Sequence, residues 1–135
     1  MAKRPLPSPD LLRKLLRYEA DTGDLYWRER PASMFRTAAE AALWNARYSG
    51  RRALSSIDRY GYRYGSVISV PCRAHRVIWA MHHGAWPEGQ IDHINHMRAD
   101  NRLSNLRAAT QQGNGRNQKK PTTNTSGVVG VLWNK

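Results

Sequence analysis

The residues of this sequence that are best suited to chemistry lie between positions 90 and 117. Asp92 and His93 stand side by side in a short apolar segment, and Asn105 and Asn114 follow further along the chain. A neutral histidine can take a proton from water near pH 7, and carboxylate and amide oxygens are ligands for a hard cation such as Mg²⁺. Hydrolysis of a phosphodiester needs both functions, because a base activates the attacking water and a cation neutralises charge on the leaving oxygen.

Each of the four residues suits one role in such a site. Asp92 and Asn114 would hold one Mg²⁺, or Mn²⁺, per site, and His93 would act as the general base. Asn105 would form a hydrogen bond with the second ring nitrogen of His93 and so fix its tautomer and direction. An Asp-His pair is common by itself and asparagines in polar loops are usually turn residues, so catalysis is indicated by the complete spacing.

The local pattern predicts a ββα unit around these residues. Residues 91–94, Ile-Asp-His-Ile, are interpreted as a short strand, in which Asp92 and His93 would point to opposite sides unless the strand end bends. Residues 105–108 resume a strand after a turn-rich loop. Thr110 can cap a helix over residues 111–118. Strand and helix would bring Asp92 and Asn114 to one cation.

The upstream sequence predicts helices and a small antiparallel sheet that support this unit. Helices are expected over residues 9–19, 38–48 and 74–81, the last ending at Gly84. Thr37 and Glu40 have the spacing of a capping box at the start of the second helix. Alternating tyrosines and β-branched residues predict strands between residues 54 and 70, and Leu25-Tyr-Trp27 predicts another. The expected fold class is α+β, with the ββα-metal unit at the C-terminal side.

A length of 135 residues suits one ordinary domain. We expect residues 1–7 to be a basic lead-in, residues 8–118 to form the domain, and residues 89–118 to be its ββα core. The composition of residues 119–135 is typical of a polar linker followed by one more strand.

The charge of the chain favours a polyanionic partner. The formal net charge is +12 and the pI is near 10.7, as in proteins that bind DNA, RNA or anionic lipid. No stretch approaches about 18 consecutive apolar residues, and the N-terminus lacks the apolar run of a secretory signal. We therefore expect an intracellular protein that does not enter a membrane.

A basic run follows His93 and contains only one acid, Asp100. Such a run is usually a solvated face, but beside a phosphodiester site it is expected to bind phosphates without reading sequence and to do so less tightly in salt. The expected DNA-binding residues are Arg98, Arg102, Arg107, Arg116, Lys119 and Lys120, of which Arg116 and Lys119 lie nearest the predicted metal helix.

Cys72 and the other histidines are open to more ordinary interpretations. Cys72 is the single cysteine, which excludes an internal disulfide and a zinc site built from cysteine pairs. His75 lies on an apolar helix, where it would be a packed core residue or a substrate contact. His82 and His83 lie in the last helical turn, where they would interact with the helix dipole.

The stretch from residue 90 to residue 117 resembles the HNH endonucleases, specifically the phage-type homing or mobile-element branch. The resemblance depends on Asp92-His93, on Asn105 within Asn-Arg-x-x-Asn-Leu-Arg, and on Asn114. It extends upstream over most of residues 8–118, through Ala74-His-Arg-Val-Ile-Trp79, Trp86-Pro-Glu-Gly89 and Thr22-Gly-Asp-Leu-Tyr-Trp27.

The resemblance implies the same four roles: Asp92 and Asn114 as metal ligands, His93 as general base and Asn105 as the residue that positions it. It also implies products with 5′-phosphate and 3′-hydroxyl ends. Many proteins of the family add a cysteine-based zinc site, which a chain with one cysteine lacks. Residues 124–133 resemble the opening strand of the three-stranded DNA-binding domain of plant ethylene-response factors, so we expect the start of a truncated second module there.

The expected function is a divalent-metal-dependent DNA endonuclease of nicking or homing type, phage-encoded and active in the host cytoplasm. Its partner is double-stranded DNA, bound by a monomer or by a dimer assembled on the duplex. Two alternatives stay open from the sequence. One is a non-catalytic DNA-binding module that uses the same basic surface, and the other is a nuclease that cuts RNA, since the hydrolytic chemistry is shared.

Overall fold

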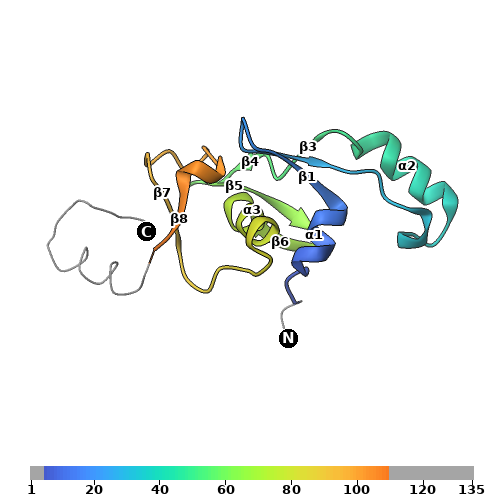
Figure 1. The fold of residues 1–135 in the computed structure, drawn as a ribbon. Helices are drawn as coiled ribbons and strands as arrows, with labels where there is room; N and C mark the ends of the chain where they lie inside the picture. Colours follow the sequence, from blue (N-terminus) through green and yellow to red (C-terminus); the bar gives the residue numbers. More distant parts are fainter. Residues whose placement is uncertain (1–4, 110–135) are drawn as a thin grey trace, which may run out of the picture.

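The computed structural model describes residues 5–109, and Figure 1 shows its elements in an elongated arrangement. In chain order the elements are α1 (Pro9–Leu15), β1 (Leu16–Glu19), β2 (Asp24–Trp27), the 3-10 helix η1 (Ala32–Met34), α2 (Ala38–Tyr48), β3 (Arg52–Ala53), β4 (Ser56–Ile57), β5 (Arg63–Val67), β6 (Val70–Arg73), α3 (Ala74–His83), β7 (Ile91–His93), the 3-10 helix η2 (Leu103–Asn105) and β8 (Leu106–Ala108). The α+β class predicted from the sequence is confirmed.

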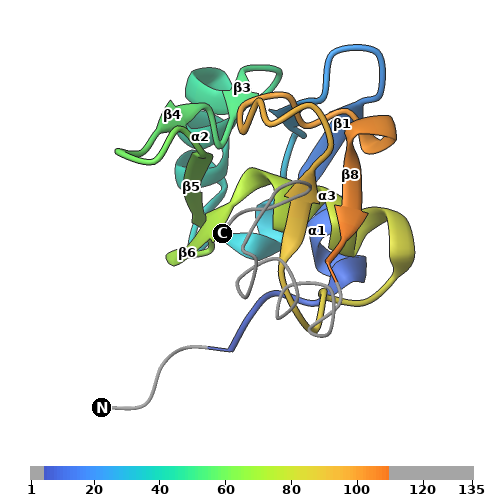
Figure 2. The ribbon, with the colours of Figure 1, turned by 90° about the vertical axis from the view of Figure 1, so that its left-hand side faces the viewer.

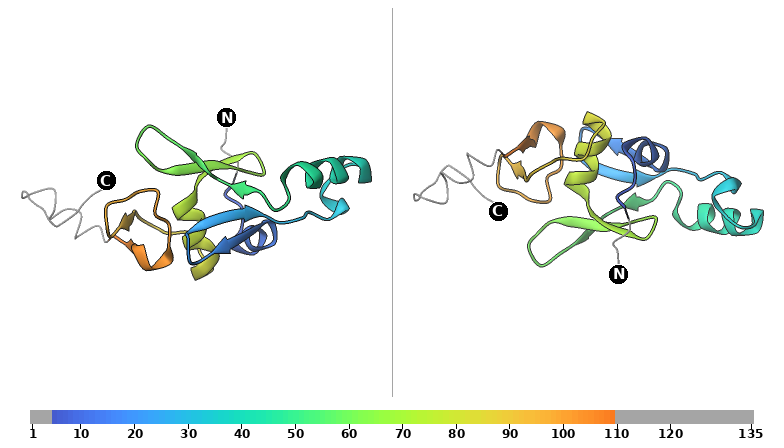
Figure 3. Two further views of the ribbon diagram at one scale, coloured as in Figure 1. Left: turned by 90° about the horizontal axis from the view of Figure 1, so that it is seen from above. Right: turned by 90° about the horizontal axis from the view of Figure 1, so that it is seen from below.

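The strands form three small antiparallel sheets, in the orders β1-β2-β3, β4-β5-β6 and β7-β8. Helices α1 and α3 lie at the centre of the molecule, whereas α2 and the β7-β8 ribbon lie at opposite ends (Figures 1 and 3). Asp92 and His93 therefore lie on the β7-β8 ribbon at one end of the molecule, beside the central helices α1 and α3.

The core holds this arrangement together through aliphatic side chains of α1, β1 and α3. Leu12, Leu15, Leu16 and Val77 have no exposed surface, and Ile78 is 1% exposed. Burial of each such side chain stabilises the fold by roughly 1.5–3 kcal/mol. The Arg13 Nε also donates to the Met81 carbonyl at 2.8 Å, which joins α1 to α3.

The first helix is shorter than the sequence predicted. A helix was expected over residues 9–19, but α1 ends at Leu15 and the chain continues as β1, which pairs with β2 from Leu16 opposite Trp27 to Glu19 opposite Asp24. Gly23, with φ of 81°, closes the turn between these strands. The prediction was wrong because pairing with a strand further along the chain outweighs local helix propensity.

Other local predictions are confirmed. Thr37 caps α2 by accepting from the Glu40 N–H at 3.1 Å, and Gly84 ends α3 in the left-handed conformation. The expected sheet appears as β4 to β6 and extends to Arg73. No helix among residues 5–109 is long and apolar enough to cross a membrane.

The domain boundaries stay predictions. Residues 1–4 of the expected lead-in, the helix predicted over 111–118, and the linker and second module predicted over 119–135 lie outside the described residues.

Candidate active site

The candidate site is built on the two-stranded ribbon of β7 and β8. Asp92 lies opposite Arg107 and His93 opposite Leu106. The Ile94 N–H donates to the Asn105 carbonyl at 2.8 Å, which extends the ribbon past His93. The predicted strand alternation is confirmed, because the His93 ring is buried whereas Asp92 is half-buried on the other face.

His93 is held by a hydrogen bond from its ring. The Nε2 atom lies 2.8 Å from the Oδ1 atom of Asn101. An amide oxygen can only accept, so Nε2 carries the hydrogen and Nδ1 holds the lone pair. Burial lowers the pKa of His93 below its ordinary value, although Asn101, Asp92 and Asp100 oppose that shift. His93 is therefore neutral at pH 7, with Nδ1 as its basic atom.

Two aromatic rings enclose His93. The His75 ring lies edge-on to it at a centroid distance of 5.0 Å, and the Tyr62 ring lies 6.0 Å away. His75 is 4% exposed and stacks on Tyr62 at 5.2 Å. Burial is the main cause that lowers the pKa of His75 to about 3, and the charges of Arg76, Arg73 and a protonated His93 add to the shift. The structure thus favours the packed-core interpretation of His75, as a neutral wall beside His93.

Asn105 does not form the predicted bond to the His93 ring. Its side-chain Oδ1 accepts from the Asn95 N–H at 2.9 Å, and its Nδ2 donates to Asn95 Oδ1 and to the Asp100 carbonyl, each at 2.9 Å. Asn105 therefore closes the loop between β7 and β8, and Asn101 within that loop takes the contact with His93. Asn105 cannot take the role predicted for it because its side chain is already hydrogen-bonded across the base of the loop.

Sequence reasoning missed Asn101, because it treated this residue as an ordinary turn asparagine. A signal was present. Asn101 and Asn105 are the two asparagines of the Asn-Arg-x-x-Asn-Leu-Arg motif, and both are buried, at 1% and 5% exposure. Buried amides need hydrogen-bond partners, so the motif as a whole indicates two fixed amides.

On the opposite face of β7, Asp92 contacts Arg107. The Asp92 Oδ2 atom lies 3.3 Å from Arg107 Nη2 and 3.4 Å from Arg107 Nε, and the Asp92 side chain is 17% exposed. Charge-assisted hydrogen bonds are ordinarily about 2.7–2.9 Å long, so this pair is loose. Among residues 5–109, no three His, Cys, Asp or Glu side chains gather where they could share a metal ion. Asn114, the second predicted metal ligand, lies outside the described residues.

The predicted DNA-binding arginines differ in their partners. Arg102 forms a two-point ion pair with Asp100, at 2.8 and 2.7 Å, and this contact holds the pKa of Asp100 well below its usual range. Arg107 is paired with Asp92. Arg98 instead donates to the Tyr60 carbonyl at 2.8 Å and lies 5.0 Å from the Tyr62 ring centroid. Of these three arginines, only Arg98 has no carboxylate partner among the described residues. Arg116, Lys119 and Lys120 lie outside the described residues.

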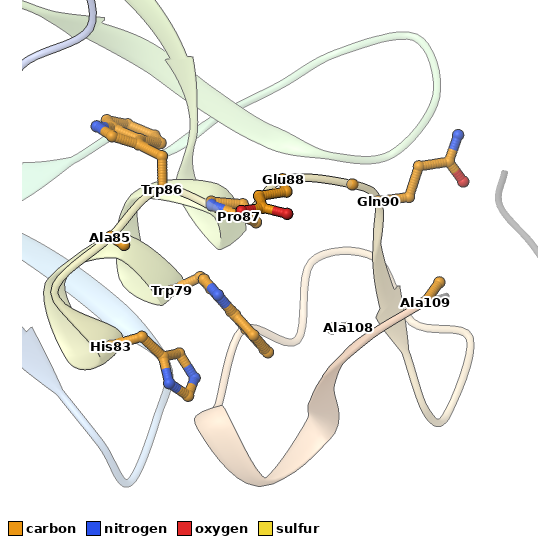
Figure 4. Close-up of a pocket in the computed structure, with 10 residues that line it drawn as sticks. Trp79, His83, Ala85, Trp86, Pro87, Glu88, Gln90, Ala108 and Ala109 are labelled. Carbon is orange, nitrogen blue, oxygen red and sulfur yellow. The ribbon is translucent and has the colours of Figure 1, made fainter. Parts of the chain in front are cut away.

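A cavity of about 570 Å³ lies beside the ribbon, between α3, residues 85–90 and the end of β8 (Figure 4). Trp79, Trp86 and Pro87 form much of its wall, and Ala108 and Ala109 close one side. Neither His93 nor Asp92 lines it. The candidate catalytic residues therefore lie outside this cavity.

Comparison with known proteins gives two matches. Residues 72–116 match a family model described as HNH endonuclease. The chain is also 41% identical over 64 residues to Protein 3.8 of Escherichia phage T7, an alignment that covers 47% of this chain and 53% of that protein. The chain thus spans about half the length of the curated relative it matches. No solved structure matches the chain.

Proposed function

Because residues 72–116 match a family model described as HNH endonuclease, we propose that this protein is a divalent-metal-dependent DNA endonuclease that leaves 5′-phosphate and 3′-hydroxyl ends. The observation that carries the proposal is the state of His93. Its Nε2 is bound to Asn101 at 2.8 Å and its pKa is lowered by burial, so a neutral ring offers Nδ1 as a base. In this proposal Nδ1 takes the proton of the water that attacks phosphorus.

Asp92 suits the role of a metal ligand in this site. Its carboxylate is half-buried and loosely paired, so a cation can displace Arg107 without breaking a short ion pair. We propose that Asp92 and Asn114 hold one Mg²⁺ or Mn²⁺. When bound, such an ion would neutralise the negative charge that develops on the leaving oxygen.

Substrate phosphates are proposed to contact Arg98 first among the described arginines. Arg98 lies over Tyr62, whose ring also stacks on His75 and faces His93. Arg73 lies on the same ring at 4.3 Å and is paired with Asp58 at 3.1 Å. Arg98 thus combines a charge that His93 senses with the lack of a carboxylate partner among the described residues, whereas Arg73 is paired. Arg116, Lys119 and Lys120 remain proposed contacts that follow along the chain.

A supercoiled plasmid tests the proposal. With Mg²⁺, wild-type protein should convert it to open circles, because one active site per chain cuts one strand, and EDTA should abolish conversion. A dimer assembled on the duplex would add linear product at higher protein concentration. We also propose that the substrate is double-stranded DNA and that the protein acts in the cytoplasm of a phage-infected host, which the similarity to a phage T7 protein supports.

Parallel incubations separate the alternatives. Cleavage of a matched RNA but not of DNA would assign the site to RNA. Retardation of DNA in a gel without cleavage, across Mg²⁺ and Mn²⁺, would instead support a non-catalytic DNA-binding module. Equal cutting by wild type and His93→Ala would contradict the proposed site.

A further inference from the structure

The loop that contacts His93 is held by a residue from the other end of the described chain. The Tyr18 hydroxyl donates to the Asn101 carbonyl at 2.8 Å and accepts from the Leu103 N–H at 2.9 Å. Burial raises the pKa of Tyr18, so the hydroxyl stays protonated and able to donate. Tyr18 thus fixes the backbone on both sides of Arg102, directly after the residue that bonds His93.

The turn of the same hairpin packs against the same peptide group. Gly23, between β1 and β2, is so close to the loop that a Cβ atom there would lie 2.5 Å from the Arg102 nitrogen and 2.6 Å from the Asn101 carbonyl carbon. Only a residue without a side chain permits this approach, and its φ of 81° favours glycine as well. Figures 1 and 2 both show the β1-β2 hairpin beside the loop that leads into β8.

Asn101 is consequently fixed from two sides. Its carbonyl is bound by Tyr18, its peptide is packed on Gly23, and its side chain is 1% exposed. The only hydrogen bond that its side chain makes among the described residues is the one to His93. A buried amide with one partner transmits its position to that partner, because moving it would leave polar atoms unsatisfied.

We infer that the β1-β2 hairpin is the positioning device of the general base: Tyr18 and Gly23 fix Asn101, and Asn101 holds His93 with the hydrogen on Nε2 and the lone pair on Nδ1. This inference rests on the proposed nuclease function for its kinetic consequence. Tyr18 and Asn101 are positioning residues that act through His93 and touch no reacting atom.

Kinetic variants test the inference under single-turnover conditions. Removing the hydroxyl in Tyr18→Phe should lower the cleavage rate at saturating DNA about tenfold, and Asn101→Leu should lower it about 100-fold, while the DNA concentration at half-maximal rate stays within about twofold. Tyr26→Phe is the matched control, because Tyr26 lies on the same hairpin and its hydroxyl makes no hydrogen bond among the described residues. Its rate should equal that of wild type.

The double variant decides whether Tyr18 acts through Asn101. In the Asn101→Leu background, Tyr18→Phe should cost less than about twofold, because the path to His93 is already broken. A full additional tenfold loss would overturn the proposed path. So would a Tyr18→Phe enzyme that cleaves as fast as wild type, or one that changes the half-maximal DNA concentration alone.

A second readout needs no catalysis. The nitrogen chemical shifts of the His93 ring, measured on the full chain near pH 8 without DNA, should show a single tautomer with hydrogen on Nε2 in wild type and in Tyr26→Phe. In Asn101→Leu they should move to values averaged over both tautomers, with a smaller change in Tyr18→Phe. Unchanged shifts in both variants would contradict the inference. A chain that cuts no nucleic acid would refute the proposed function, while the tautomer measurement would still decide the positioning.

Discussion

Asp92 and His93 are neighbours in sequence, yet the two faces of β7 provide them with opposite surroundings. His93 is 5% exposed and is enclosed by Asn101, His75 and Tyr62. Asp92 meets one exposed arginine at 3.3 Å. His93 is thus held by the folded protein before any substrate binds, whereas Asp92 has only a loose partner. If the proposed roles hold, the fold prepares the general base, and the metal site at Asp92 is completed only when a cation replaces Arg107.

The largest expected effect follows removal of the base. His93→Ala should lower the cleavage rate about 10³-fold, within the usual range for a general base. His82→Ala is the matched control, since His82 is an exposed histidine on α3 outside the proposed site. Cleavage of an end-labelled duplex at saturating DNA and Mg²⁺ measures both variants. A loss below about tenfold would remove His93 from the proton-transfer step.

The second largest expected effect is a change in the Mg²⁺ dependence of cleavage when Asp92 is replaced. Asp92→Asn removes the negative charge but keeps an oxygen ligand, so the Mg²⁺ concentration at half-maximal rate should rise between about 10- and 100-fold. The positive charge of Arg107 would then lie beside the cation without a counter-ion. DNA affinity measured in EDTA should stay within about twofold of wild type. A weakened DNA affinity with unchanged Mg²⁺ dependence would place Asp92 in substrate binding instead.

The burial of His75 beside His93 predicts that the stability of the fold depends on pH. Folding lowers the pKa of His75 from 6.5 to about 3, so between these values the unfolded chain binds a proton that the folded chain does not. The contribution of neutral His75 to the free energy of unfolding is therefore complete above pH 6.5. It is lost as the pH falls towards 3, by up to about 1.4 kcal/mol per pH unit. Urea unfolding from pH 7 to pH 4 measures the slope.

His75→Phe provides the control for that measurement. The substitution keeps an aromatic ring against Tyr62 and removes the titrating group, so the slope below pH 6.5 should become shallower. His93, Asp58 and Asp100, whose pKa values are also lowered in the folded protein, would contribute to the remaining slope. An identical slope in wild type and variant would show that His75 does not titrate in this way.

The smallest expected effect concerns DNA affinity. Arg98→Ala should weaken binding about threefold at moderate salt and reduce the salt dependence by about one phosphate contact. Arg47→Ala removes the same charge from the last turn of α2, at the opposite end of the molecule, and should leave affinity unchanged (Figure 1). Fluorescence anisotropy in EDTA compares the two. Equal weakening by both would indicate a general effect of charge.

Local chemistry explains which features could be predicted from the sequence. Thr37, Gly84 and the strand alternation at Asp92 and His93 each act within a few residues, and the structure has all three as expected. The pairing of β1 with β2, which shortens the first helix, depends on contacts between separate segments. Local propensity alone does not contain that information.

The candidate site divides in the same way. The ribbon that carries Asp92 and His93 was predictable, but the partner of His93 was not. Asn101 and Asn105 share one motif and one chemistry, and the choice between them depends on Tyr18, which bonds the Asn101 carbonyl from far away in the sequence. The ion pairs of Arg102 and Arg107 were also invisible, because a basic run does not show which of its members meet a carboxylate.

The measurement that tests the central contrast most directly is a Mg²⁺ titration of DNA cleavage by the two variants of β7. Asp92→Asn should recover most of the wild-type rate as Mg²⁺ rises, because its defect lies in holding the cation. His93→Ala should stay about 10³-fold slow at every Mg²⁺ concentration, because no cation replaces the missing base. Recovery of His93→Ala by Mg²⁺, or a rate for Asp92→Asn that does not respond to Mg²⁺, would contradict the assignment of the two faces.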